Sequence, residues 1–199
     1  MNNNDNFFTV GVKSLREHIL EVAKKLFIKN GYNATTTGDI VEYSGSSKGN
    51  LYHHFKTKEN LFLEIINIEI EKWFAGWLEE GEKCQSNREK FYLINEISVK
   101  RDAYYQLQTA INEFYAREHE SKYIEEKINE FEKRYVDIYF DILSAGNREN
   151  EWNIEDVESA SQIAAATING IITFTIKIDK KKRMELMERF SQIFLKGVE

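Results

Sequence analysis

The chain has 199 residues, with 27 basic and 33 acidic side chains and a formal net charge of −6. Its balance of 42% hydrophobic and 30% charged residues is typical of globular proteins and excludes a disordered chain. Ten glycines and no proline are too few for many short strands and tight turns, so we expect an all-α fold. The single cysteine, Cys84, excludes an intramolecular disulfide framework and a cysteine-based zinc site.

Neither a secretion signal nor a membrane span is expected. Residues 1–5 are polar and are not followed by the basic-then-apolar pattern of a signal peptide. The most apolar stretch, residues 160–178, contains Gln162, Asn169 and Lys177, which disfavours a membrane span and favours a buried or subunit-facing helix. Together with the cysteine content, this predicts a cytoplasmic protein with no membrane partner.

The charge is uneven along the chain. Residues 1–60 hold eight basic and six acidic side chains, for a net +2, whereas residues 61–199 carry a net −8. A basic front and an acidic back suggest two functional parts, with a polyanion docking on the front. We expect a disordered tail over 1–12, a first domain over 13–57 and a second over 58–199.

The first two elements are expected to be a long helix and a short one. Apolar residues recur at helical spacing over 14–30, and Gly31 can adopt the left-handed conformation that ends such a helix. Thr36 offers an N-cap, with Asp39 three residues later in the manner of a capping box. The short helix that follows ends near Gly45.

Two further helices complete the front of the chain. Ser46 or Ser47 caps a short helix over 48–55, and Thr57 caps a longer one over about 58–80. The second and third helices are separated by a four-residue turn that contains glycine. This spacing predicts a helix-turn-helix within a three-helix unit.

The third of these helices has the composition of a DNA-recognition helix. Its first turn is small or polar, which lets the backbone approach base edges. Gly49 costs about 1 kcal/mol relative to alanine inside a helix, which is understandable if a side chain there would strike DNA. Lys48 can donate to a guanine edge or a phosphate, and Asn50 can pair with a base edge. The side chains of Tyr52, His54 and Lys58 suit phosphate contacts.

The stretch from Gly31 to Val41, with its continuation from Gly45 to Leu61, strongly resembles the DNA-binding region of the TetR family of bacterial regulators. The shared pattern here reads TTTGDIV, then GSSKGNLYHHFKTKENL, with all gaps intact. The resemblance covers about residues 13–62. It implies an operator DNA partner, a homodimer, a small-molecule effector, no enzymatic activity and no cofactor. It implies that the following residues contact DNA: Thr36, Thr37, Lys48, Gly49, Asn50, Tyr52, His54 and Lys58. We expect Ser47 and His53, from the same part of the chain, to contact DNA as well.

A metal site is the alternative interpretation of the His53–His54 pair. Adjacent helical side chains point about 100° apart, and no third ligand lies nearby in the sequence. We therefore expect no metal.

Helical patterning continues through the rest of the chain. Residues 88–98 and 101–117 fit helices, and from Ser121 onward apolar residues recur in steps of three and four. We expect a polar loop over 145–153 and a helix over 154–178.

The two last helices are expected to form the homodimer interface. The 154–178 segment is apolar on more than one face, so we expect it to be covered both by its own domain and by a second copy of the chain. A shorter apolar seam follows over 186–193. The expected interface residues are Ala164, Ile168, Ile171, Ile172, Phe190 and Phe194.

Aromatic residues are abundant in the central helices and can line a cavity. The family resemblance implies that this part of the chain binds a small inducer. An aromatic lining with an acidic balance suits a hydrophobic or cationic compound. The expected ligand-binding residues are Trp73, Trp77, Tyr104, Asn112, Glu113 and Tyr135.

Three functions remain open at this point. The first is a dimeric repressor that leaves its operator when the effector binds, with activation as the alternative logic. The second is a helical enzyme, which is disfavoured because the chain contains no HExxH, no Glu-x-x-His pair and no glycine-rich phosphate loop. The third is a helical adaptor that has kept the fold and lost its affinity for DNA.

Overall fold

The computed structural model describes residues 14–100, 102–119, 121–175 and 177–198. Within this part the chain is helical, which confirms the all-α expectation; the expected tail, residues 1–12, lies outside it. The helices are α1 (Leu15–Ala34), α2 (Thr37–Ser44), α3 (Lys48–Phe55), α4 (Lys58–Gly81), α5 (Asn87–Lys100), α6 (Asp102–Tyr115), α7 (Lys122–Arg148), α8 (Val157–Phe174) and α9 (Lys180–Val198). No helix in the described ranges is both long and apolar enough to cross a membrane.

Local sequence signals set the ends of the first four helices. Thr36, Ser47 and Thr57 are N-caps, and each accepts a hydrogen bond from the backbone N–H three residues later. Gly45 ends α2 in the left-handed conformation, with φ 61°. Gly31, with φ 81°, interrupts α1, and one further turn follows it. These features confirm the helix-turn-helix predicted from the sequence.

The loop expected over 145–153 is shorter than predicted, because α7 continues to Arg148. Trp152 folds back onto the end of this helix and donates a hydrogen bond from Nε1 to the Leu143 carbonyl at 2.8 Å. Its indole ring lies against Gly146, where there is no side chain to block it. The extra turn of α7 is thus covered by a residue that follows it in the chain.

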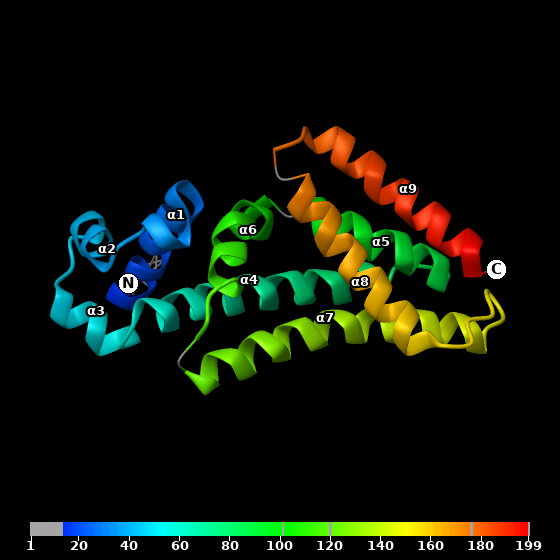
Figure 1. Ribbon diagram of the computed structural model, residues 1–199, viewed down its shortest axis with the longest axis horizontal. Helices are drawn as coiled ribbons and strands as arrows, with labels where there is room; N and C mark the ends of the chain where they lie inside the picture. Colours follow the sequence, from blue (N-terminus) through cyan, green and yellow to red (C-terminus); the bar gives the residue numbers. More distant parts are fainter. Residues whose placement is uncertain (1–13, 101, 120, 176, 199) are drawn as a thin grey trace, which may run out of the picture.

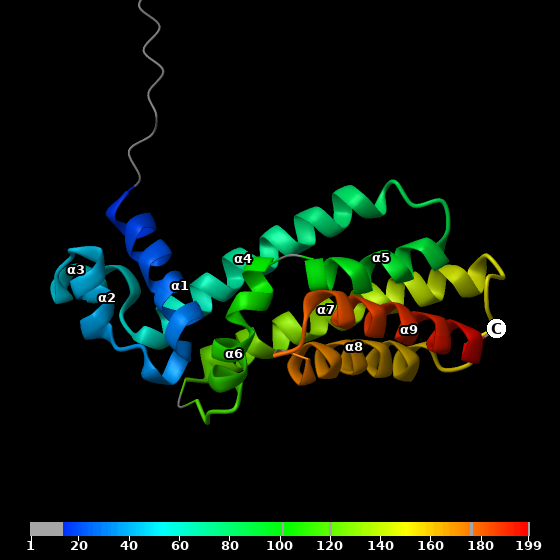
Figure 2. The ribbon, with the colours of Figure 1, turned by 90° about the horizontal axis from the view of Figure 1, so that it is seen from above.

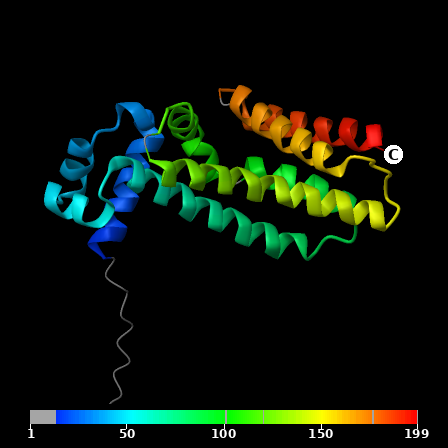
Figure 3. The same ribbon diagram turned by 60° about the horizontal axis from the view of Figure 1, so that its bottom comes forward.

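The helix-turn-helix unit forms one end of an elongated molecule (Figure 1). From this end α4 runs toward the middle of the molecule, and Figure 2 shows α6 packed across the base of the unit next to α1. α7 lies alongside α4 (Figure 3), while α5, α8 and α9 form the opposite end.

Two apolar clusters form the core. One contains buried residues of α1 to α4 together with α6 and the first turns of α7. The other joins the second half of α4 to α5, α7, α8 and α9. The helix-turn-helix unit and the remaining helices therefore share a core through α4 and α6.

A buried carboxylate fastens α4 to α1. Glu69 is 5% exposed, and its Oε1 atom lies 2.8 Å from Lys24 Nζ and 3.0 Å from Lys72 Nζ. Burial acts to raise the pKa of Glu69, but the hydrogen bonds from the two ammonium groups outweigh it and hold the pKa below its usual range. The carboxylate therefore stays ionised and paired, which fixes α4 against the helix that begins the helix-turn-helix unit.

Candidate DNA interface and ligand pocket

The first turns of α3 present an uncovered polar surface. Leu51 is fully buried and Phe55 is 3% exposed, and these two side chains attach α3 to the core. The remaining side chains of the helix face outward, apart from the half-buried His54. The exposed residues that we expected to contact DNA are Thr36, Ser47, Lys48, Gly49, Asn50, Tyr52 and His53.

Gly49 is not required by the fold. A Cβ atom at this position would meet only Ser47 Oγ at 3.7 Å, which is ordinary van der Waals contact. Its backbone is helical, so alanine would fit and would stabilise the helix by about 1 kcal/mol. The absence of a side chain at this position therefore suits the close approach of another molecule to α3.

The other expected DNA contacts have mixed surroundings. Thr36 is exposed, but its Oγ1 atom and its backbone N–H donate to Asp39 Oδ2 at 2.7 Å and 2.8 Å, and these two hydrogen bonds lower the pKa of Asp39. Thr37 is half-buried at the start of α2. His54 lines a groove against α4 with Asn60 and Leu63 rather than the outer row of α3.

The structure corrects the expected role of Lys58. Its Nζ atom donates to the carbonyls of Tyr32 and Thr35, both at 2.9 Å, and lies 4.1 Å from the centre of the Tyr32 ring. Burial, and then the nearby Arg117 guanidinium, lower the pKa of Lys58. In the free chain its ammonium therefore holds the end of α1, because the carbonyls at the end of a helix attract cations, and it does not extend from the surface as an unpaired phosphate ligand would.

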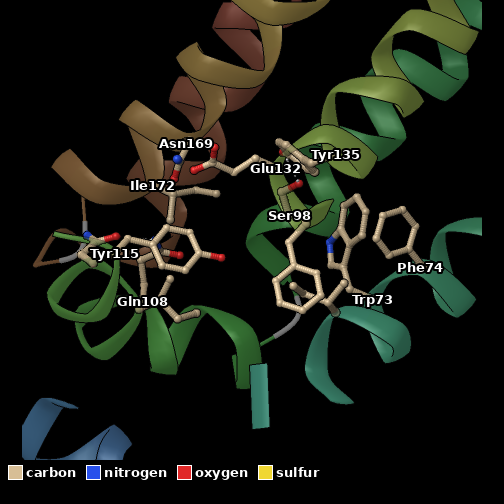
Figure 4. A pocket seen from close by; sticks show the side chains of 13 residues that line it. Trp73, Phe74, Ser98, Gln108, Tyr115, Glu132, Tyr135, Asn169 and Ile172 are labelled. Carbon is tan, nitrogen blue, oxygen red and sulfur yellow. Dashed lines mark hydrogen bonds between the residues drawn. The ribbon is translucent and has the colours of Figure 1, made fainter. Parts of the chain in front are cut away.

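A cavity of about 120 Å³ lies in the middle of the molecule between α4, α5, α6, α7 and α8 (Figure 4). The aromatic rings of Trp73 and Phe74 form one wall, and Tyr115 and Ile172 lie opposite. Polar groups also line it: Ser98, Gln108, Asn112, Glu132, Tyr135 and Asn169. The cavity is therefore mainly apolar, with a few polar groups to orient a ligand.

Three of the six expected ligand residues line this cavity: Trp73, Asn112 and Tyr135. Trp77 is instead part of the core at the far end of α4. Glu113 points away from the cavity and contacts α1. The Tyr104 side chain lies outside the described residues.

The cavity contains one carboxylate that the sequence did not single out. Glu132 comes from α7, where it lies between the apolar residues Phe131 and Tyr135, and Figure 4 shows it extending toward Asn169 of α8. The Tyr135 hydroxyl lies 3.1 Å from Ser98 Oγ, and burial raises the pKa of Tyr135, so the phenol is neutral. Glu132, whose side chain is itself exposed, is therefore the charged group among the residues that line the cavity; its position directly after Phe131 of the α7 seam was the available signal.

The expected dimer residues do not form an outer surface. Ala164 and Ile168 are fully buried within the chain, and Ile172 lines the cavity, so the prediction that these three face a partner is corrected. Ile171 is half-buried, and the half-buried rings of Phe190 and Phe194 pack against Phe91. The large apolar side chains that are exposed on α8 and α9 are Ile163, Phe174 and Ile193.

Comparisons with known proteins agree with this architecture. Residues 19–65 match the family described as bacterial regulatory proteins, tetR family, and residues 69–199 match the family described as QacR-like protein, C-terminal region. The HTH-type transcriptional regulator QacR of Staphylococcus aureus is 57% identical over 185 residues, which cover 93% of this chain and 98% of that protein.

Solved structures share the fold at much lower identity. The regulator FadR from Bacillus subtilis in complex with stearoyl-CoA has a TM-score of 0.79 at 22% identity, covering 92% of this chain and 99% of that one. A putative regulator from Saccharomonospora viridis in complex with choline has a TM-score of 0.78 at 18% identity, covering 92% and 97%. The relatives are transcriptional regulators, and this chain, matched along nearly its whole length, belongs to the TetR family of bacterial regulatory proteins.

Proposed function

We propose that this protein is a homodimeric transcriptional repressor that binds operator DNA through α3 and is released by a small hydrophobic cation bound in the central cavity. The observation that carries this proposal is the arrangement of α6, which lies between the cavity and the helix-turn-helix unit. Since operator DNA is inside the cell, the proposal also places the protein in the cytoplasm.

Opposite faces of α6 meet the cavity and α1. Gln108, Asn112 and Tyr115 line the cavity, whereas the Phe114 ring packs edge-on against Tyr32 of α1 with centroids 5.0 Å apart. The cavity of about 120 Å³ is smaller than the roughly 150 Å³ that holds a benzene molecule in other proteins. A larger compound can therefore bind only if α6 or a neighbouring helix is displaced. Such a compound binds the displaced state better, which is the condition for a ligand to shift the equilibrium.

Release follows from the geometry of a two-fold dimer. In such a dimer the two recognition helices enter successive major grooves about 34–36 Å apart. A tilt of the helix-turn-helix unit changes this separation and therefore weakens the binding of DNA at both half-sites. Coupling between ligand and DNA in such systems is typically about 1–3 kcal/mol.

A direct test uses duplex DNA from the region upstream of the protein's own gene, with fluorescence anisotropy as the measurement. We expect specific binding whose logarithm falls linearly with the logarithm of salt concentration, because phosphate contacts release counterions. We also expect tetraphenylphosphonium, a hydrophobic cation, to lower the affinity of the protein for this DNA. Absence of binding to any such fragment would favour the adaptor alternative.

Glu132 is expected to select for cationic ligands. Replacing Glu132 with glutamine removes the charge at the exposed edge of the cavity while keeping its shape, so the Kd for tetraphenylphosphonium should rise about threefold, as expected for a solvent-exposed charge. Quenching of tryptophan fluorescence measures this, because Trp73 lines the same cavity. Glu126→Gln, an exposed carboxylate elsewhere on α7, is the matched control and should have no effect. An equal loss for a neutral aromatic probe would contradict a charge-based role.

The outer face of α8 and α9 is proposed as the dimer interface. Ile163 is 58% exposed and Ile193 61% exposed, and the two helices pack together at this end of the molecule (Figure 3). An Ile193→Glu variant should raise the dimer dissociation constant at least about a hundredfold, because a two-fold interface buries each substitution twice.

Sedimentation velocity over a range of protein concentrations measures the dimer dissociation constant. Leu78→Glu, at a position 64% exposed on α4, is the matched control and should remain a dimer. A dimer of Ile193→Glu as tight as the unmodified protein would place the interface elsewhere.

A further inference from the structure

The end of α1 is the point where the rest of the protein holds the helix-turn-helix unit. Residues 31–35 lie directly before the N-cap of α2, so their position sets the position of α2 and, through the turn at Gly45, of α3. Lys58 holds this segment from the side of α4, through two backbone carbonyls. A second contact to this segment comes from α6.

Glu113 of α6 makes that second contact. Its Oε2 atom accepts a hydrogen bond from the backbone N–H of Asn33 at 2.8 Å. Its two carboxylate oxygens lie 2.7 Å and 2.9 Å from the point where a Cβ atom on Gly31 would stand. Gly31 is favoured here because φ is 81°, and the Glu113 carboxylate fills the space beside its Cα.

Arg117, one turn beyond Glu113, adds to this contact. Its Nη1 atom donates to Asn33 Oδ1 at 3.3 Å, and its guanidinium carbon lies 5.4 Å from the centre of the Tyr32 ring. Tyr32 is fully buried beneath these groups, and burial, with the Glu59 carboxylate, raises its pKa to about 12. The segment is thus fixed by directional hydrogen bonds on top of an apolar contact.

The direction of these bonds matters for transmission. Apolar contacts between α6 and α1, such as Phe114 on Tyr32, depend less steeply on distance and angle than a charged hydrogen bond does, so they resist sliding of one helix over the other less strongly. The charge-assisted hydrogen bond from Asn33 N–H to a carboxylate depends on distance and angle, so it fixes the register of the two helices. Glu113 also directly follows Asn112, which lines the cavity, so a ligand that moves Asn112 moves Glu113 with it.

We propose that Glu113 is the positioning residue that couples the cavity to the DNA-binding unit: its carboxylate makes residues 31–35 follow the movement of α6. This inference rests on the proposed release of DNA by an effector, and it assigns that coupling to one side chain. It gives Glu113 a role other than the ligand contact expected from the sequence.

The test compares Glu113→Ala and Glu113→Gln with the unmodified protein. The measured quantity is the ratio of operator Kd with saturating tetraphenylphosphonium to operator Kd without it. We expect this ratio to fall at least about fivefold in Glu113→Ala, which is the lower end of typical coupling factors. The Kd for tetraphenylphosphonium in the absence of DNA should stay unchanged, because the side chain lies outside the cavity. Glu113→Gln keeps an oxygen that can accept from Asn33, so it should retain more of the ratio than alanine does.

Controls separate the coupling from stability and from the proposed function. Glu80→Ala removes a carboxylate of the same type, paired with Lys83 at the far end of α4, and should leave the ratio unchanged. Hydrogen exchange of the backbone N–H of Asn33 should be faster in Glu113→Ala, and its measurement needs neither ligand nor DNA.

Two results would overturn the assignment of Glu113. One is an unchanged ratio in Glu113→Ala while the unmodified protein responds to the ligand. The other is Asn33 exchange as slow in Glu113→Ala as in the unmodified protein, which decides the matter even if tetraphenylphosphonium fails to release DNA and the proposed effector class is itself wrong.

Discussion

Replacing Trp152 with alanine is expected to lower the free energy of unfolding by about 3–5 kcal/mol. The indole is 5% exposed, and its Nε1 atom donates to the Leu143 carbonyl at 2.8 Å, so alanine leaves a cavity and removes this hydrogen bond. Urea unfolding followed by circular dichroism, at one fixed protein concentration, measures the change. Tyr123→Ala, at a position 56% exposed on α7, should change stability by less than about 0.5 kcal/mol.

Gly146 makes this prediction sharper through a double-mutant cycle. A Cβ atom at Gly146 would lie 2.0 Å from Trp152 Cζ2, so Gly146→Ala alone should destabilise the protein strongly. In the Trp152→Ala background the clash disappears, and the same substitution should become neutral or stabilise by up to about 1 kcal/mol, since alanine favours a helix interior. Additive effects of the two substitutions would contradict the packing of the indole on α7.

Replacing Gly49 with leucine is expected to abolish specific operator binding, by a factor of at least about 100, while the fold is preserved. The position is exposed and no other part of the described chain approaches it closely, so a side chain is tolerated by the free protein. On DNA the same side chain would separate α3 from the base edges in both half-sites, where each good contact contributes about 1–3 kcal/mol.

Two measurements check this prediction. Gly49→Ala should raise the free energy of unfolding by up to about 1 kcal/mol while it weakens operator binding, so that stability and affinity change in opposite directions. Ala75→Leu, a small-to-large change at another exposed position, on α4, should affect neither. Full operator affinity in Gly49→Leu would mean that α3 does not lie in a groove of DNA.

Local signals made much of the front of the molecule predictable. The capping residues Thr36, Ser47 and Thr57 and the left-handed Gly45 act within three or four residues of the helix ends that they set. Such effects do not depend on what packs against the helix, so the predicted bounds of α2, α3 and α4 agree with the structure within one residue.

The direction in which a helix face points depends on its neighbours, and here sequence reasoning failed. Helical spacing identified an apolar stripe on α8, but it did not distinguish the cavity and core, where Ile168 and Ile172 lie, from the outer surface with Ile163. Glu113 and Asn112 were both expected to give the cavity a polar contact, yet neighbours in a helix point about 100° apart, and Glu113 contacts α1 instead.

The sequence by itself determined the helical class, the helix-turn-helix and the residues that α3 exposes, since capping, turn chemistry and composition act over a few residues. Only the tertiary structure decided which groups the charged side chains contact. Lys58 is held by the carbonyls at the end of α1, Glu132 lies at the exposed edge of the cavity, and Glu113 binds the segment before α2. The physical reason is that a charged side chain takes its role from the groups that surround it in space, and those groups come from helices far apart in the chain.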